Sequence, residues 1–291
     1  MWQALWPKHQ LERIPVSHVT NGVHLATWMA DWMMDLLDRE LGPNWGSRLE
    51  DPPLLERVLD IDAGALWDVH ARLKYRLLKY VGEEARRRGK ETDRQAAAGM
   101  LLSPDALTIG FARRFAAYKR ADLVFLDPDR LRGIVTDEGR PVQIVFAGKA
   151  HPNDEGGKLI LQRVYQFASD PEFKGRIAFL EDYEMHLAHR LVQGVDLWLN
   201  VPRVPLEACG TSGMKAGLNA VPQLGTRDGW WAEGYNAKNG WCIPVEWLQT
   251  MRHALHQTLA RFTARTMVSR YADEFYVPSI RGEGPPPPPQ G

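Results

Sequence analysis

The sequence predicts an α/β fold, a doubly wound parallel sheet with flanking helices, because two kinds of segment alternate after about Ser103. Short apolar runs, each long enough for one buried strand, lie at residues 107–112, 142–147, 176–180 and 195–199. Stretches with helical spacing separate them, most clearly at residues 155–168 and 184–193. Buried strands that alternate with helices are typical of a parallel sheet covered on both faces. Ligands of such sheets bind beyond the carboxyl ends of the strands, so the segments that follow the four runs are where function is expected.

The composition fits a globular protein of one domain, or of one and a half. The chain has 291 residues, 44% of them hydrophobic, and its 36 Lys+Arg balance 36 Asp+Glu for a formal net charge of zero. This balance argues against a general nucleic-acid-binding protein, which usually has a basic excess. No apolar run approaches the roughly 20 residues of a membrane span, and the first eight residues lack the features of a signal peptide. Two cysteines, Cys209 and Cys242, are too few for a disulfide scaffold, which indicates a reducing compartment and a cytoplasmic location.

Helical patterns also flank the predicted sheet on both sides in the sequence. Residues 31–99 are mostly helical in pattern, with apolar side chains such as Leu66, Leu73 and Leu77 at helical spacing. Residues 246–275 predict one or two terminal helices. Prolines at every position from 285 to 289 exclude helix and sheet pairing, so the end of the chain is expected to be an extended, disordered tail.

A cluster of cations follows the first predicted strand. Arg113, Arg114, Lys119 and Arg120 lie within eight residues. Such a cluster is costly unless it is solvated or faces anions, and guanidinium groups match phosphate oxygens well. From these residues alone, a phosphate site and a surface-exposed basic turn are equally good interpretations.

A glycine-rich turn follows the fourth predicted strand. Residues 210–213 are small and lead into an apparent helix from Met214, so their backbone N–H groups and the helix dipole can bind an anion. A lysine at the start of a helix opposes the dipole, which makes Lys215 unfavourable there unless it has another task. One such task is a Schiff base to an aldehyde cofactor that carries a phosphate; the alternative is a solvated lysine. Glu207 is either an ordinary loop carboxylate or an acceptor for sugar hydroxyls.

The histidines predict no metal site. His186 and His189 lie three residues apart on a predicted helix without a second pair, and the other histidines lack the spacing of metal ligands. The sequence also lacks the Gly-x-Ser-x-Gly nucleophile elbow of a serine hydrolase.

Five segments together resemble one known family, the α-glucan (glycogen, starch and maltodextrin) phosphorylases, most closely the shorter bacterial and archaeal type. They are residues 18–24 (HVTNGVH), 110–120 (GFARRFAAYKR), 147–152 (AGKAHP), 205–215 (PLEACGTSGMK) and 228–235 (DGWWAEGY). They occur in the family's order over roughly residues 15–280.

The resemblance implies the Rossmann-like C-terminal lobe of a two-lobed glycosyltransferase fold, which holds pyridoxal 5'-phosphate. It makes Lys215 the Schiff-base lysine, with the cofactor phosphate bound by backbone N–H groups of Thr211, Ser212 and Gly213 and by the charge of Arg113. The aromatic residues expected on or near the cofactor ring are Trp28 and Tyr183. The residues expected to hold the substrate orthophosphate are Arg114 and Lys119. Those expected at the glucosyl unit are Asn21, Glu207, Cys209 and Gly210.

The implied activity is that of a hexosyltransferase. Orthophosphate would cleave terminal α-1,4-glucosidic bonds of an α-glucan to give α-D-glucose 1-phosphate with retention, and the cofactor phosphate would assist as a proton shuttle. Two phosphates in contact repel strongly at low dielectric, so positioning and charge compensation by the cations would account for most of the catalysis.

The sequence departs from the longer animal-type enzymes at several motif positions. Arg113 stands where they carry lysine, Ser212-Gly213 replaces a Gly-Asn pair, Cys209 replaces serine and Glu184 replaces an arginine after the aromatic residue. The change at Glu184 alters one expected cofactor contact.

The chain matches only the C-terminal portion of these enzymes, which leads to a division into five parts. We expect residues 1–30 to be a remnant of the N-terminal lobe and lobe junction, 31–104 a mainly helical segment of the C-terminal lobe, 105–245 the Rossmann-like cofactor-binding core, 246–280 C-terminal helices and 281–291 the tail. The expected partners are a separate N-terminal lobe and, in a homodimer, a second copy of the chain. Weak or no activity is expected from this chain alone.

Two other interpretations stay open. A nucleotide-sugar glycosyltransferase of the glycogen or starch synthase type has the same fold, but it keeps a second carboxylate eight residues after the first, where this chain has Lys215. A non-catalytic remnant is the other, and the intact cationic and glycine-rich segments weigh against it.

Overall fold

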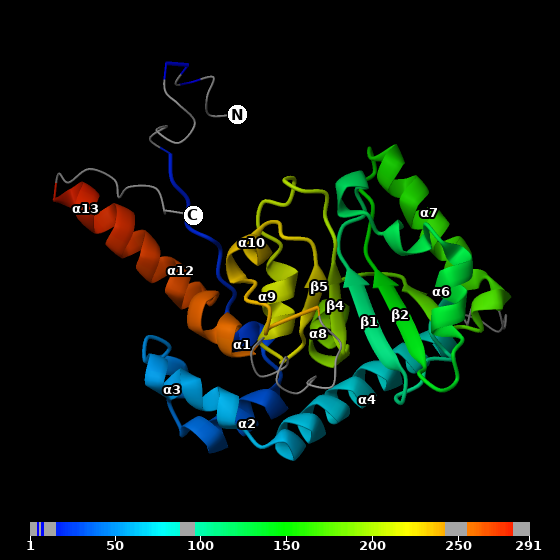
Figure 1. The fold of residues 1–291 in the computed structure, drawn as a ribbon, viewed down its shortest axis with the longest axis horizontal. Helices are drawn as coiled ribbons and strands as arrows, with labels where there is room; N and C mark the ends of the chain where they lie inside the picture. The colour runs from blue at the N-terminus through cyan, green and yellow to red at the C-terminus, as the bar shows by residue number, and fades with distance from the viewer. Residues whose placement is uncertain (1–4, 6, 9–15, 88–96, 242–254, 282–291) are drawn as a thin grey trace.

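The structure, a computed structural model, describes residues 5, 7–8, 16–87, 97–241 and 255–281 (Figure 1). Its centre is a five-stranded parallel sheet with the strand order β3-β2-β1-β4-β5. The strands are β1 (Leu107–Ala112), β2 (Val142–Ala147), β3 (Ile177–Leu180), β4 (Leu197–Asn200) and β5 (Gln223–Gly225). The predicted fold class is confirmed, and the order of the strands reverses between β1 and β4, where doubly wound sheets bind their ligands.

The helices that connect the strands are α6 (Pro128–Val135), α7 (Glu155–Ser169), α8 (Met185–Gly194) and α9 (Thr211–Gly217). Those outside the sheet are α1 (Leu25–Trp28), α2 (Asp31–Leu41), α3 (Pro52–Glu56), α4 (Ala63–Arg87), α10 (Trp230–Gly234), α12 (Ala264–Tyr271) and α13 (Val277–Ile280). Residues 255–261 are also helical, and a π-helical turn, Ala272–Tyr276, joins α12 to α13. Single 3₁₀ turns lie at Trp45–Ser47, Arg57–Asp60, Ala117–Lys119, Leu123–Phe125 and Pro171–Phe173.

Two hydrophobic cores cover the two faces of the sheet. Successive residues of β2 alternate between them: the Val145 side chain packs into one core with α4, α8 and α9, and Phe146 into the other with α6 and α7. This alternation follows from the period of two along a strand, and it makes every residue of a central strand apolar or buried. Figure 1 shows α4 running along one side of the sheet, while α12 and α13 form one rod that extends away from it.

A buried ion cluster joins α4 to the amino ends of β1 and β4. Asp196 accepts hydrogen bonds from His70 Nε2 and Lys74 Nζ, each at 2.6 Å, and from the backbone N–H of Thr108, also at 2.6 Å. Lys74 Nζ also donates to the carbonyl of Ala106 at 2.8 Å. The cluster lies at the end of the sheet opposite to the carboxyl ends, so it holds the scaffold together.

β1 and β2 occur with the predicted bounds, and β3, β4, α7 and α8 occur with their ends shifted by one or two residues, as is usual for such predictions. The predicted helical segment 31–99 is interrupted after α2, because Gly42 (φ +90°) and Pro43 end that helix, and it continues in α3 and α4. Residues 88–96 of this segment lie outside the described residues. The terminal helices agree with the prediction over residues 255–275. The tail at 285–289 lies outside the described residues. No helix in the described part of the chain is long and apolar enough to span a membrane.

Candidate active site

The site is built where the carboxyl ends of β1 and β4 lie side by side. Arg113 directly follows β1, and Asn200 is the last residue of β4. Arg113 Nη1 donates to Asn200 Oδ1, so the loop after β1 is anchored to the neighbouring strand. A glycine allows this loop to pass close to the next one: Gly148 has φ +153°, and a Cβ there would lie 2.0 Å from the Arg113 carbonyl oxygen.

One carboxylate holds two of the predicted cations. Glu207 Oε2 accepts a hydrogen bond from Arg113 Nη2 at 2.5 Å and another from Lys119 Nζ. The three side chains are buried, with 8%, 8% and 7% of Glu207, Arg113 and Lys119 exposed. The Glu207 N–H donates to Asp228 Oδ2 at 2.9 Å, which fixes the loop that carries the carboxylate.

This ion cluster of Arg113, Lys119 and Glu207 carries one net positive charge in a buried position. Burial lowers the pKa of Arg113, and the nearby Glu207 carboxylate opposes that shift. Because a buried charge without compensation is costly, the cluster favours a further anion. Arg113 and Lys119 are thus buried together, whereas the alternative interpretation was a surface-exposed basic turn.

The other two cations of the segment lie elsewhere. Arg120 Nε and Nη2 donate to the backbone carbonyls of Val201 and Pro202 at 2.7 and 2.9 Å, so this side chain clamps the loop after β4. Arg114 is exposed to solvent.

The glycine-rich turn has the backbone conformation expected of an anion-binding turn, but its helix begins earlier than predicted. Gly210 is left-handed (φ +78°), and α9 starts at Thr211 instead of Met214. Lys215 therefore lies in the last turn of α9, and the expectation that it opposes the helix dipole is wrong. Ser212 Oγ accepts a hydrogen bond from Trp198 Nε1 at 3.2 Å, which ties the first turn of α9 to β4.

The structure explains why residue 213 is glycine in this chain. A Cβ on Gly213 would lie 1.8 Å from Gln223 Oε1 and 2.8 Å from Trp230 Nε1. The side chains of Gln223 and Trp230 fill the space beside this glycine, so the Gly-Asn pair of the longer enzymes would not fit without rearrangement.

Lys215 is half-buried against an aromatic ring. Its Nζ lies 3.6 Å from the centre of the Trp28 ring, a cation–π contact. Asn219 Nδ2 donates to the carbonyls of both Trp28 and Lys215, each at 2.9 Å, and so joins α1 to α9. Burial lowers the pKa of Lys215, which increases the fraction of neutral, nucleophilic amine near neutral pH.

This lowered pKa predicts that Lys215 is acylated at lower pH than an ordinary lysine, whose pKa is about 10.4. Competitive labelling with acetic anhydride between pH 6 and 11, read by peptide mass spectrometry, measures it. The Lys215→Arg variant identifies the Lys215 peptide. A titration midpoint at or above the ordinary lysine value contradicts the prediction.

The remaining predicted residues lie next to these groups. Burial raises the pKa of Tyr183 while the charge of Arg113 opposes the shift, so this phenol lies near Arg113. Burial also raises the pKa of the Cys209 thiol, and hydrogen bonds with Asn21 oppose it. Asn21 and Cys209, from distant parts of the sequence, are therefore in contact. Thr211 is half-buried at the first position of α9.

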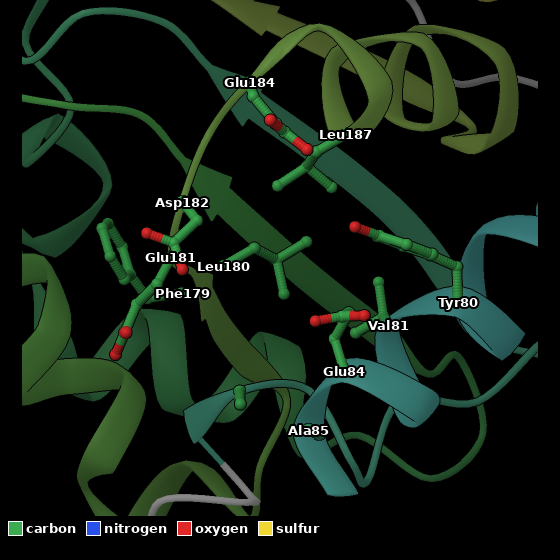
Figure 2. Close-up of a pocket in the computed structure, with 11 residues that line it drawn as sticks. Tyr80, Val81, Glu84, Ala85, Phe179, Leu180, Glu181, Asp182, Glu184 and Leu187 are labelled. Carbon is green, nitrogen blue, oxygen red and sulfur yellow. The ribbon is translucent and has the colours of Figure 1, made fainter. Parts of the chain in front are cut away.

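A cavity of about 300 Å³ lies next to the loop that carries Tyr183 (Figure 2). Four carboxylates line it, those of Glu84, Glu181, Asp182 and Glu184. Their negative charges do not suit a phosphate, so this cavity is not the anion site. The Glu184 side chain, which replaces the arginine of the longer animal-type enzymes, is one of the carboxylates that line this cavity (Figure 2).

The sequence alone indicated no role for Asn200 or Asp228. In the structure, Asn200 accepts a hydrogen bond from Arg113, and Asp228 accepts one from the Glu207 N–H. An asparagine at the last position of a buried strand is the signal that could have found Asn200. Groups of His, Cys, Asp or Glu that could hold a metal ion are absent among the described residues.

Comparisons with known proteins identify relatives of this chain. The family model for carbohydrate phosphorylases matches residues 2–234. Glycogen phosphorylase from Aquifex aeolicus is 42% identical over 98% of this chain and 46% of its own length, and maltodextrin phosphorylase from Thermococcus litoralis is 40% identical over 96% and 38%. Glycogen phosphorylase from Mycobacterium tuberculosis is 37% identical over 97% of this chain and 37% of its own length. The chain thus spans less than half the length of these curated relatives, and it belongs to the carbohydrate phosphorylase family.

Proposed function

We propose that this chain forms the cofactor- and phosphate-binding part of an α-glucan phosphorylase, which uses orthophosphate to release α-D-glucose 1-phosphate from the ends of α-1,4-glucans. The observation that carries the proposal is the buried ion cluster beside the glycine-rich turn, because it concentrates positive charge where anions bind. Its relatives are named glycogen and maltodextrin phosphorylases.

The residues present fit pyridoxal 5'-phosphate. Arg113 Nε is buried and has no hydrogen-bond partner among the described residues, so a donor is available for a phosphate oxygen. Lys215 would hold the aldehyde carbon, and the backbone N–H groups of Thr211 and Ser212 would bind the phosphate, whereas the Gly213 N–H donates to the Gly210 carbonyl at 3.2 Å. Trp28, already against the Lys215 amine, and Tyr183, near Arg113, would pack against the ring. The cofactor would supply a phosphate group able to exchange protons near neutral pH.

The other residues of the site would position the substrates. Lys119, with Arg114 from the exposed side, would bind orthophosphate and reduce its repulsion from a second phosphate. The carboxylate of Glu207 would accept hydrogen bonds from glucosyl hydroxyls, next to Asn21, Cys209 and Gly210. Since Glu207 also contacts both cations, sugar and phosphate would be aligned by one side chain.

The proposal includes partners and a location. An N-terminal lobe would complete the glucan-binding cleft, since the relatives are more than twice as long as their matched portions. Assembly as a homodimer and a cytoplasmic location, the latter supported by two cysteines in the whole chain, stay predictions.

Reduction with borohydride after addition of pyridoxal phosphate is expected to attach the cofactor to Lys215, because its amine has a lowered pKa and belongs to the helix that follows the proposed phosphate-binding turn. Peptide mapping locates the label. The Lys215→Arg variant serves as the control and should lose it. A label on another lysine, or none, would falsify the cofactor assignment.

A further inference from the structure

The two polar atoms of the Asn200 side-chain amide, Oδ1 and Nδ2, differ in their hydrogen bonding. This residue ends β4 and is 0% exposed. Its Oδ1 accepts the hydrogen bond from Arg113 Nη1, and this fixes which end of the amide carries the donor. Its Nδ2 is buried and has no hydrogen-bond partner in the part of the chain that the structure describes.

The free Nδ2 faces the glycine-rich turn. A Cβ placed on Gly210 would lie 3.4 Å from Asn200 Nδ2, closer than any other atom, and the next closest is Glu207 Cγ at 3.5 Å. The amide therefore lies directly beside the left-handed residue that precedes α9. Arg113 Nε, from the adjacent strand end, is a second buried donor without a partner among the described residues.

Two buried donors at the adjoining carboxyl ends of β1 and β4 require acceptors, because buried polar groups are nearly always hydrogen-bonded. We propose that Asn200 is a phosphate-binding residue of this site: its Oδ1 positions the Arg113 guanidinium, and its Nδ2 donates to an oxygen of the cofactor phosphate held at residues 210–213. This inference rests on the proposed function. A neutral amide on a rigid strand adds a directed donor without adding charge to a cluster that is already positive.

Two variants separate binding from mere support of Arg113. In Asn200→Asp, an acceptor for Arg113 remains, but the donor is replaced by a negative oxygen. In Asn200→Ala, both are lost. The dissociation constants of pyridoxal phosphate and of pyridoxal, which lacks the phosphate, are measured for each variant by spectrophotometric titration.

We expect Asn200→Ala to weaken pyridoxal phosphate binding about 10-fold and Asn200→Asp about 100-fold, since one loses a hydrogen bond to a charged group and the other also adds repulsion. Pyridoxal binding should change by less than about 3-fold in both, because it makes no phosphate contact. If Asn200 only positions Arg113, Asn200→Asp should have the same dissociation constant for pyridoxal phosphate as the unaltered chain, and a lower one than Asn200→Ala. This result overturns the proposal. If the Asn200 Nδ2 binds a buried water and not the phosphate, the variants should weaken the binding of pyridoxal phosphate and of pyridoxal to the same extent. That result also overturns the proposal.

Gln143→Glu is the matched control, since it makes the same amide-to-carboxylate change in a buried side chain at the amino end of β2. Its Nε2 donates to the Ser103 carbonyl and to Thr108 Oγ1, at 2.9 and 2.8 Å. It should lower stability and leave the ratio of the two dissociation constants unchanged. If Asn200→Asp does not fold, Asn200→Ala still tests the proposal, because an unchanged ratio of the two dissociation constants in that variant overturns it.

The two proposals can fail separately. If borohydride labels Lys215 in the unaltered chain but the Asn200 variants bind pyridoxal phosphate normally, only this inference is wrong. If the unaltered chain is not labelled, the proposed cofactor itself is wrong.

Discussion

Replacing Asp196 with alanine is expected to lower the free energy of unfolding by about 3–5 kcal/mol, the usual effect of removing one partner from a buried ion pair. The variant leaves the His70 ring, the Lys74 amine and the Thr108 N–H without their acceptor in the interior. Urea unfolding followed by circular dichroism at pH 7 measures the loss.

The effect of pH on this variant follows from the pKa of Asp196. Burial raises it, but hydrogen bonds and charges from His70 and Lys74 outweigh burial, and the net pKa is lowered. A carboxylate with a lowered pKa stabilises the fold above its unfolded-state value, and that contribution disappears as the pH falls through the folded-state value. The difference between the two proteins should therefore shrink in acid.

Glu172→Ala is the control for this prediction, because Glu172 pairs with Arg132 at an exposed site. It should change the unfolding free energy by about 0.5 kcal/mol or less. A loss for Asp196→Ala as small as that of the control contradicts the structural role of the cluster.

Replacing Glu207 with alanine should also cost about 3–5 kcal/mol, in buffer without phosphate. The change leaves Arg113 and Lys119 as two buried cations without their shared carboxylate. Orthophosphate should restore part of the stability, because an anion bound only by the folded state stabilises it by mass action.

Unfolding in phosphate and in chloride at equal ionic strength tests this rescue. Asp196→Ala is the matched comparison, since it disrupts a buried ion cluster at the opposite end of the sheet. Phosphate should stabilise Glu207→Ala more than Asp196→Ala. Equal stabilisation of the two variants would show that the Glu207 cluster is not an anion site.

Much of the fold could be predicted because central parallel strands are buried on both faces and so form apolar runs. The runs that became β1 and β2 match their predicted bounds. The three-residue β5 was missed, since Gln223–Gly225 contains a buried glutamine and a glycine and is recognisable only by its pairing with β4. The helix α6 lies between the first two runs, where a helical stretch is expected but has no predicted bounds. Asp127 and Pro128 are a good start signal for it, and the Asp127 side chain accepts the Arg130 N–H at 3.0 Å.

The sequence by itself determined the fold class and the family, because the identity and order of motif residues are local information. Only the tertiary structure decided that Arg113 and Lys119 share Glu207 and that Arg120 binds the loop after β4. It also decided that Lys215 lies on Trp28 and that Asn200 faces Gly210. These contacts join residues up to 187 positions apart, counted from Trp28 to Lys215. The physical reason is that the order of strands in the sheet, which depends on how the helices pack on its two faces, brings such distant residues together.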